Sequence, residues 1–82
     1  MNYNIGDTVK IKSIDWYNKN KDWQGNVSTD VTDCYGMDVV FSKSMTIYCG
    51  SILVIENIYP NGEIGMKNIG FSFTNEMIEC KY

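Results

Sequence analysis

The sequence predicts a mainly β protein that folds as one small barrel. Residues that favour helices are scarce, since alanine is absent and leucine occurs once, whereas isoleucine occurs ten times. Short segments of alternating apolar and polar residues recur along the chain, and turn signals separate them. A chain of 82 residues fits one domain, so we expect a single domain over residues 1–82.

Five or six short strands are expected. In residues 5–14, the turn signal Gly6-Asp7 precedes Val9 and Ile11, which alternate with lysines as in a half-buried strand. The run I-L-V-I within residues 51–59 is apolar on both faces, which is typical of a central strand. The other expected strands are shorter and lie at residues 39–41, 64–67, 71–73 and 77–78.

One or two single-turn helices are expected between these strands. Ser42 can cap a turn that places Met45 and Tyr48 on one face, and Gly50 suits the position after the turn. Thr74 can cap a second turn before the last strand. A hairpin is indicated by the segment Pro60-Asn61-Gly62.

Residues 15–37 are expected to form one long connection of 23 residues. They are polar and contain many Asn, Asp, Ser and Thr side chains, and their apolar residues show no helical period. A stable amphipathic helix is therefore not expected within residues 15–25. Connections longer than about 12–15 residues are uncommon in compact domains unless they are functional or carry local structure.

The first half of this connection is the best candidate for a binding site. Its sequence, D-W-Y-N-K-N-K-D-W-Q-G, holds both tryptophans of the chain. Tryptophan and tyrosine give a large contact area at low entropic cost and are enriched at binding hot spots. The expected partner-binding residues here are Trp16, Tyr17, Lys19, Lys21 and Trp23.

The two tryptophans are expected to differ in role. Trp16 can fold back on the barrel as a core residue, whereas Trp23 is the better candidate for contact with a partner. The acidic part of the same connection adds Asp30 and Asp33 to the expected partner-binding residues. The structural alternative for these two aspartates is a solvated polar loop.

Catalytic chemistry is not expected. The chain has no histidine, so a Ser-His or Cys-His nucleophile pair cannot form. The three cysteines are widely spaced without a C-x-x-C motif, and a zinc site would lack a fourth ligand. We therefore expect no catalytic residues, no metal and no cofactor, and three free thiols that pack as small hydrophobic groups.

Charge and hydropathy limit the expected partners and location. The net charge is −3 and arginine is absent, which disfavours nucleic acid as a partner. No apolar run approaches the roughly 20 residues of a membrane-spanning helix, and the chain begins with a polar segment. The expected location is the cytoplasm, and the sequence does not specify an oligomeric state.

A series of short motifs spans nearly the whole chain: G-D-x-V at 6–9, W-Y at 16–17, Phe41, Met45, Y-C-G at 48–50 and T-x-E-M at 74–77. This pattern resembles small SH3-like barrel proteins encoded by phages and prophages of gut bacteria. It departs from them at Phe73, where those proteins often carry Trp, and at Asn75, where they often carry Asp. The resemblance implies an SH3-like barrel and a phage or another mobile element as the setting.

The function expected from these observations is a non-enzymatic, protein-binding accessory module of a phage or mobile element. Inhibition of a host defence protein would fit that setting and the acidic charge. The alternative is an SH3-like barrel that binds single-stranded nucleic acid, in which Lys19 and Lys21 lie beside stacking aromatic side chains.

Overall fold

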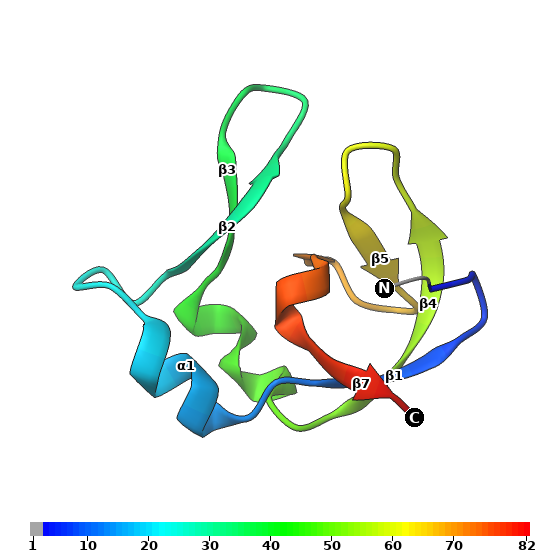
Figure 1. Ribbon diagram of the computed structural model, residues 1–82, viewed down its shortest axis with the longest axis horizontal. Coiled ribbons are helices and arrows are strands. Elements are labelled where there is room, and N and C mark those ends of the chain that lie inside the picture. The colour runs from blue at the N-terminus through cyan, green and yellow to red at the C-terminus, as the bar shows by residue number, and fades with distance from the viewer. Residues whose placement is uncertain (1–2) are drawn as a thin grey trace.

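The strands of this protein form two antiparallel sheets (Figure 1). A computed structural model describes residues 3–82. In this part of the chain, strands account for 38% and helices for 20% of the residues, which confirms the mainly β class. The sheets do not close into a barrel. Where one small barrel was expected, the strands form an open arrangement, in which a two-stranded sheet accompanies a five-stranded one.

The larger sheet has the strand order β6-β5-β4-β1-β7. Val9 of β1 is paired with Leu53 on one side and Lys81 on the other, so β1 lies inside the sheet. The alternation in β1 leaves Val9 and Ile11 fully buried, as predicted. The strands are β1 (Thr8–Ile11), β4 (Ile52–Ile58), β5 (Ile64–Met66), β6 (Ser72–Phe73) and β7 (Ile78–Lys81).

Strand β4 lies in the middle of this sheet, as the apolar run predicts, but it is not covered on both faces. Ile55 is buried, whereas Ile52, Val54 and Ile58 are each about two-fifths exposed. The run therefore faces the core on one side and solvent on the other.

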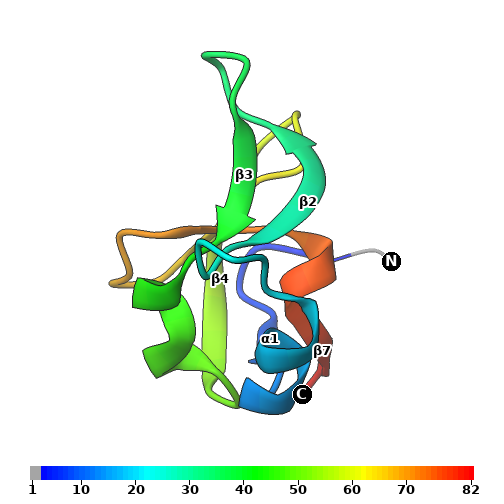
Figure 2. The same cartoon turned by 90° about the vertical axis from the view of Figure 1, so that its left-hand side faces the viewer.

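The smaller sheet consists of β2 (Val27–Thr32) and β3 (Asp38–Phe41). Its turn is held by Asp33, whose Oδ1 accepts hydrogen bonds from the amides of Tyr35 (2.9 Å) and Met37 (3.0 Å). Gly36 takes the left-handed conformation, with φ 81°, that this turn requires. Figure 2 shows the β2–β3 hairpin standing at one end of the molecule, with the helical segments towards the other.

Three helical segments complete the fold: α1 (Ile14–Asn20), η1 (Lys43–Tyr48) and η2 (Asn75–Met77). The two expected helical breaks are confirmed as the 3-10 helices η1 and η2. Helix α1 contradicts the prediction that residues 15–25 form no helix. Its stability has a local and a tertiary cause, because the Ser13 hydroxyl caps the Trp16 amide (3.2 Å) and Tyr17 is buried on the core.

The expected connection over residues 15–37 is also wrong in its second half, where β2 lies. The segment V-S-T-D-V-T alternates along the strand, with Val27 and Thr29 buried and Ser28 and Asp30 exposed. A buried threonine takes the place of an apolar residue because its hydroxyl donates a 2.6 Å hydrogen bond to the Val39 carbonyl. The alternation typical of a strand is present in this segment, but it was not recognised in the sequence because most of the residues are polar.

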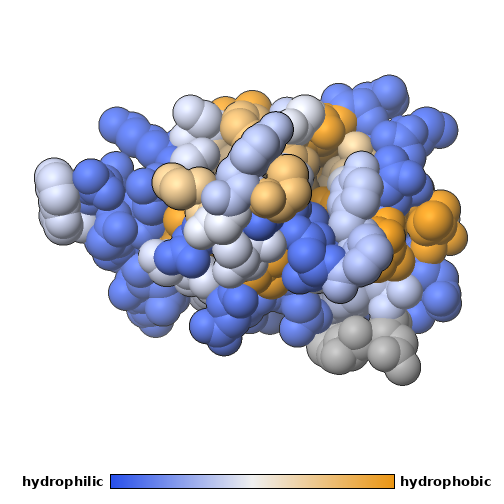
Figure 3. Space-filling view, turned by 90° about the horizontal axis from the view of Figure 1, so that it is seen from above, coloured by the Kyte–Doolittle hydropathy of each residue, from blue (hydrophilic) through white to orange (hydrophobic). Residues whose placement is uncertain are grey.

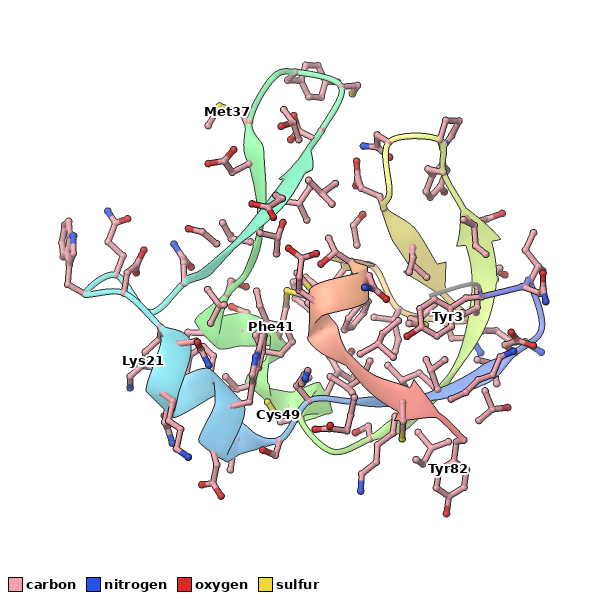
Figure 4. All side chains as sticks on the ribbon, viewed as in Figure 1. Tyr3, Lys21, Met37, Phe41, Cys49 and Tyr82 are labelled. Carbon is pink, nitrogen blue, oxygen red and sulfur yellow. The ribbon has the colours of Figure 1, made fainter. Side chains whose placement is uncertain are left out.

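The core joins the two sheets through buried aromatic and methionine side chains. Phe41 of β3 is fully buried, and its ring meets Trp16 edge-on at 5.3 Å and Tyr17 at 5.9 Å between centroids. Figure 4 shows the Phe41 side chain directed into the molecule. Tyr48 makes edge contacts with Phe71 and with the fully buried Phe73 of β6. Helix α1, η1 and both sheets therefore share one hydrophobic core.

Thr74 supplies a first test of this core. Its side chain is fully buried, and Oγ1 is the one buried side-chain polar atom in residues 3–82 without a hydrogen-bond partner. We predict that Thr74→Val raises the free energy of unfolding by about 1 kcal/mol, because the shape is kept and an unpaired hydroxyl is removed. Urea unfolding measures the change.

The matched control is Thr29→Val, at the other buried threonine. The Thr29 hydroxyl donates a hydrogen bond to the Val39 carbonyl, so the free energy of unfolding of this variant is expected to fall by about 1 kcal/mol. If Thr74→Val destabilises the protein as much as Thr29→Val does, the prediction is wrong.

Candidate functional site

The segment from Lys21 to Asn26, the Trp23 loop, connects α1 to β2 and is closed by internal hydrogen bonds. Asp22 organises it, since its carboxylate accepts hydrogen bonds from the amides of Gln24 (2.9 Å) and Asn26 (3.0 Å). The Asp22 amide donates to the Asn26 carbonyl (2.8 Å), which closes the loop at its base. The Trp23 loop is therefore held by its own side-chain and backbone hydrogen bonds.

Tyr17 ties the Trp23 loop to the core. Its hydroxyl donates a 2.6 Å hydrogen bond to the Gly25 carbonyl, while its ring packs against Phe41. Gly25 has φ +84°, and a Cβ there would lie 3.2 Å from the Tyr17 hydroxyl, so both conformation and space favour glycine. The ammonium of Lys21 lies 5.5 Å from the centre of the Tyr17 ring. Tyr17 is only 4% exposed, so most of its contact area faces inward.

The structure gives the two tryptophans opposite environments. Trp16 is half-buried against the core and in edge contact with Phe41, which agrees with the structural role expected of it. Trp23 is 91% exposed. Its expected role in partner binding remains a prediction, but its side chain is fully available for contact.

A shallow cavity of about 450 Å³ lies beside Trp23. Its wall combines aromatic surface with charged groups from α1, the Trp23 loop and η1. Lys19 is exposed on the last turn of α1 and does not line this cavity. The lining residues are Ile14, Tyr17, Asn18, Lys21, Asp22, Trp23, Gln24, Gly25, Lys43 and Thr46.

Asp30 and Asp33 lie on the β2–β3 hairpin and do not line this cavity. Asp30 is exposed, and its amide donates to the Glu76 carboxylate (3.0 Å) at η2. Asp33 is half-buried at the hairpin turn. The seven residues expected to bind a partner therefore fall into two groups, one at α1 and the Trp23 loop and the other on the hairpin.

A second cavity, the inter-hairpin groove, is lined by residues of both the β2–β3 hairpin and the β4–β5 hairpin. Its volume is about 550 Å³ and its wall is largely apolar. Of its lining residues, sequence reasoning expected only Asp33 to bind a partner, while Tyr59 was placed in a strand and Pro60 in a hairpin turn. A tyrosine beside a proline was a signal of apolar surface. The lining residues are Asp33, Cys34, Tyr59, Pro60, Asn61, Glu63 and Ser72.

The three cysteines are free, as expected, but they differ in exposure. The expectation of packed thiols holds only for Cys49, which is half-buried and whose pKa is raised by burial. Cys34 and Cys80 are exposed: Cys34 lies in the turn of the β2–β3 hairpin beside the inter-hairpin groove, and Cys80 lies on β7, an edge strand of the larger sheet.

Within residues 3–82, no three cysteine or acidic side chains lie close enough together to hold a metal ion. None of the helices in this part of the chain has the length and apolar character needed to cross a membrane. No family model, no curated protein and no solved structure gives a significant match to the chain.

Tyr17 provides a test of how the Trp23 loop is held. We predict that Tyr17→Phe lowers the free energy of unfolding by about 1 kcal/mol, because the Gly25 carbonyl loses a partly buried hydrogen bond while the ring packing is kept. Urea unfolding measures the loss, and faster amide exchange at Gln24 and Gly25 would report the loosened loop. An unchanged exchange rate would show that Asp22 alone holds the loop.

The cysteine environments predict an order of alkylation. With iodoacetamide at pH 8, Cys34 and Cys80 should react before Cys49, since burial raises the pKa of the Cys49 thiol, which lowers its thiolate fraction, and its side chain is half-buried. Mass spectrometry of the digested protein gives the three rates. In urea the rates should converge, and a native Cys49 as fast as Cys80 would contradict its placement.

Proposed function

We propose that this protein is a protein-binding module without enzymatic activity, and that Trp23 is its main contact residue. The observation that supports the proposal is a 91% exposed tryptophan on a loop that hydrogen bonds hold in one shape. The setting proposed with it is that of an accessory protein of a phage or mobile element that acts in the host cytoplasm. In that setting, the partner would be a host or phage protein, such as a host defence protein that this module inhibits.

Exposing the large apolar surface of a tryptophan to water is unfavourable. A tryptophan buries on the order of 150–250 Å² when it is covered, so covering Trp23 would contribute strongly to binding. A loop that is already ordered loses little conformational entropy when a partner docks. Asp22 and Tyr17 supply this order in the free protein.

The surroundings of Trp23 have the composition of a contact surface. Lys21 and Lys43 lie with Asp22 around the cavity beside it, so an apolar anchor is edged by charges of both signs. Interfaces between proteins commonly combine an aromatic centre with a polar rim.

The same two lysines support nucleic-acid binding as the alternative function. A base could stack on Trp23 while Lys21 and Lys43 contact phosphates. The net charge of −3 argues against it, because phosphate neutralisation supplies most of such affinity. A titration of labelled single-stranded DNA at low salt tests this function, and the absence of binding would reject it.

The proposed function predicts a specific loss in Trp23→Ala. In affinity capture from a lysate of the host cell, proteins retained by the native protein should be reduced by about tenfold or more with this variant, as is typical of a tryptophan hot spot. Tyr82→Ala is the matched control, since Tyr82 is also exposed, at 78%, but lies at the end of β7.

Circular dichroism should show that both variants fold as the native protein does. Retention of the same partners in equal amounts by Trp23→Ala would reject Trp23 as the contact residue. If the native protein retains no protein from the lysate, the proposed protein-binding function is rejected for the conditions of that experiment.

A further inference from the structure

The inter-hairpin groove is a second surface with its own chemistry, and it does not include Trp23. Tyr59 and Pro60 supply apolar wall from the β4–β5 hairpin, and Cys34 faces them from the β2–β3 hairpin. Tyr59 is 47% exposed and Tyr35, at the tip of the β2–β3 hairpin, is 87% exposed. Seen from above the hairpin tips, pale and orange side chains gather near the centre of the face, with blue side chains around them (Figure 3).

The two hairpins contact each other through the turn of the β4–β5 hairpin, so the groove is formed in the free protein. Asn61 Nδ2 donates a 3.0 Å hydrogen bond across it to the Thr32 carbonyl. A Cβ on Gly62 would lie 3.3 Å from the Val31 side chain, so the two hairpins are in close contact there and a larger residue would require Val31 to shift. Binding in this groove would therefore not require the hairpins to be brought together first.

Charge is strongly segregated between the hairpins and the rest of the chain. Residues 27–41 and 52–66 contain five of the ten acidic residues and none of the seven lysines. The remaining residues hold five acids and seven lysines, a formal charge of +2. The hairpin acids are Asp30, Asp33, Asp38, Glu56 and Glu63.

Within residues 3–82, these acids form no ion pair with a lysine. The ion pairs in residues 3–82 join Lys12 to Glu79 and Lys81 to Asp7, and none reaches a hairpin acid. Asp33 and Glu63 both line the groove, one on each hairpin. Asp33 uses Oδ1 for its turn, and Glu63 uses Oε1 to accept a hydrogen bond from Asn61, so each keeps its second oxygen for a ligand.

We propose that the inter-hairpin groove binds a short basic and apolar peptide segment of a protein partner. Apolar side chains of the segment would cover Tyr59 and Pro60, while Lys or Arg side chains on either side would meet Asp33 and Glu63. This surface goes beyond the role of Trp23 and does not depend on it. Nucleic acid is a disfavoured ligand for this groove, because its phosphates would face negatively charged carboxylates.

Cys34 makes the groove directly measurable. It is exposed and lines the groove, while Cys80 is exposed on β7 and provides an internal control. The probe is the blocked peptide Lys-Arg-Leu-Phe-Leu-Arg-Lys, added to the full chain before alkylation with iodoacetamide. At about ten times the dissociation constant, the peptide should slow alkylation of Cys34 by about tenfold and leave Cys80 unchanged.

Two control peptides separate the contribution of the basic side chains from that of the apolar side chains. A peptide with Glu in place of every basic residue should not protect Cys34, because it would face like charges. A peptide with Ser in place of Leu and Phe should protect it at least about fivefold less well, because it cannot cover the apolar wall.

The protein variant that tests the charges is Asp33→Asn with Glu63→Gln. Both amides keep a side-chain oxygen that can accept the native hydrogen bonds, so the turn and the Asn61 contact are retained. Affinity for the basic peptide should fall by about fivefold, with a weaker dependence on salt. Asp15→Asn with Glu79→Gln is the matched control, which makes the same change in net charge away from the groove and should bind as the native protein does.

Three results would overturn the proposal. They are alkylation of Cys34 that the peptide does not change, equal protection of Cys80, and protection of Cys34 by concentrated protein alone, which would assign the groove to a second copy of the chain. Trp23→Ala is carried through the same titration and should bind the peptide normally. Failure of the peptide therefore does not affect the proposed role of Trp23, and failure of lysate capture does not affect the groove.

Discussion

The structure depends on the burial of Phe41 between α1 and the two sheets. Chains of this size expose a large share of their surface, so each buried aromatic residue matters more than in a larger core. A two-stranded hairpin such as β2–β3 is marginal by itself, and α1 has only seven residues, which is too short for independent stability. The contacts of Phe41 with Trp16 and Tyr17 stabilise both elements at once. Because Tyr17 also holds Gly25, the same core contact positions the loop that displays Trp23.

The thin core also explains why so much potential contact surface is left at the two ends of the molecule. The hairpins extend beyond the core. The Asn61–Thr32 hydrogen bond and the close approach of Gly62 to Val31 join them to each other, and the Asp30–Glu76 hydrogen bond joins the β2–β3 hairpin to η2. Their outer parts carry acidic and aromatic side chains. At the other end, α1 and η1 present Lys21 and Lys43 around the cavity beside Trp23. An acidic apolar groove and a mixed-charge aromatic surface therefore belong to different parts of one small chain, and they need not bind the same partner.

Several elements could be predicted because their signals are local. The alternation of Val9 and Ile11 with lysines predicts β1, and Pro60-Asn61-Gly62 predicts the β4–β5 hairpin. Helix α1 could not be predicted from apolar periodicity, because its buried face is little more than Trp16 and Tyr17, and the surface that covers them comes from distant β3. Strand β2 was concealed for a related reason, since Thr29 is acceptable in the core only when its hydroxyl reaches Val39 on the neighbouring strand.

The sequence by itself determined the mainly β class, the turns, the free thiols and the supply of exposed aromatic and acidic residues, because these follow from composition and short-range pattern. Only the tertiary structure decided which aromatic residue is available for contact. Trp16 and Trp23 both follow an aspartate, yet one packs on Phe41 and the other is exposed, since burial depends on what the fold places opposite each side chain. The inter-hairpin groove likewise exists only in the tertiary structure. Asp33 and Glu63 are thirty positions apart in the chain, and they become neighbours of one cavity only when the two hairpins pack together.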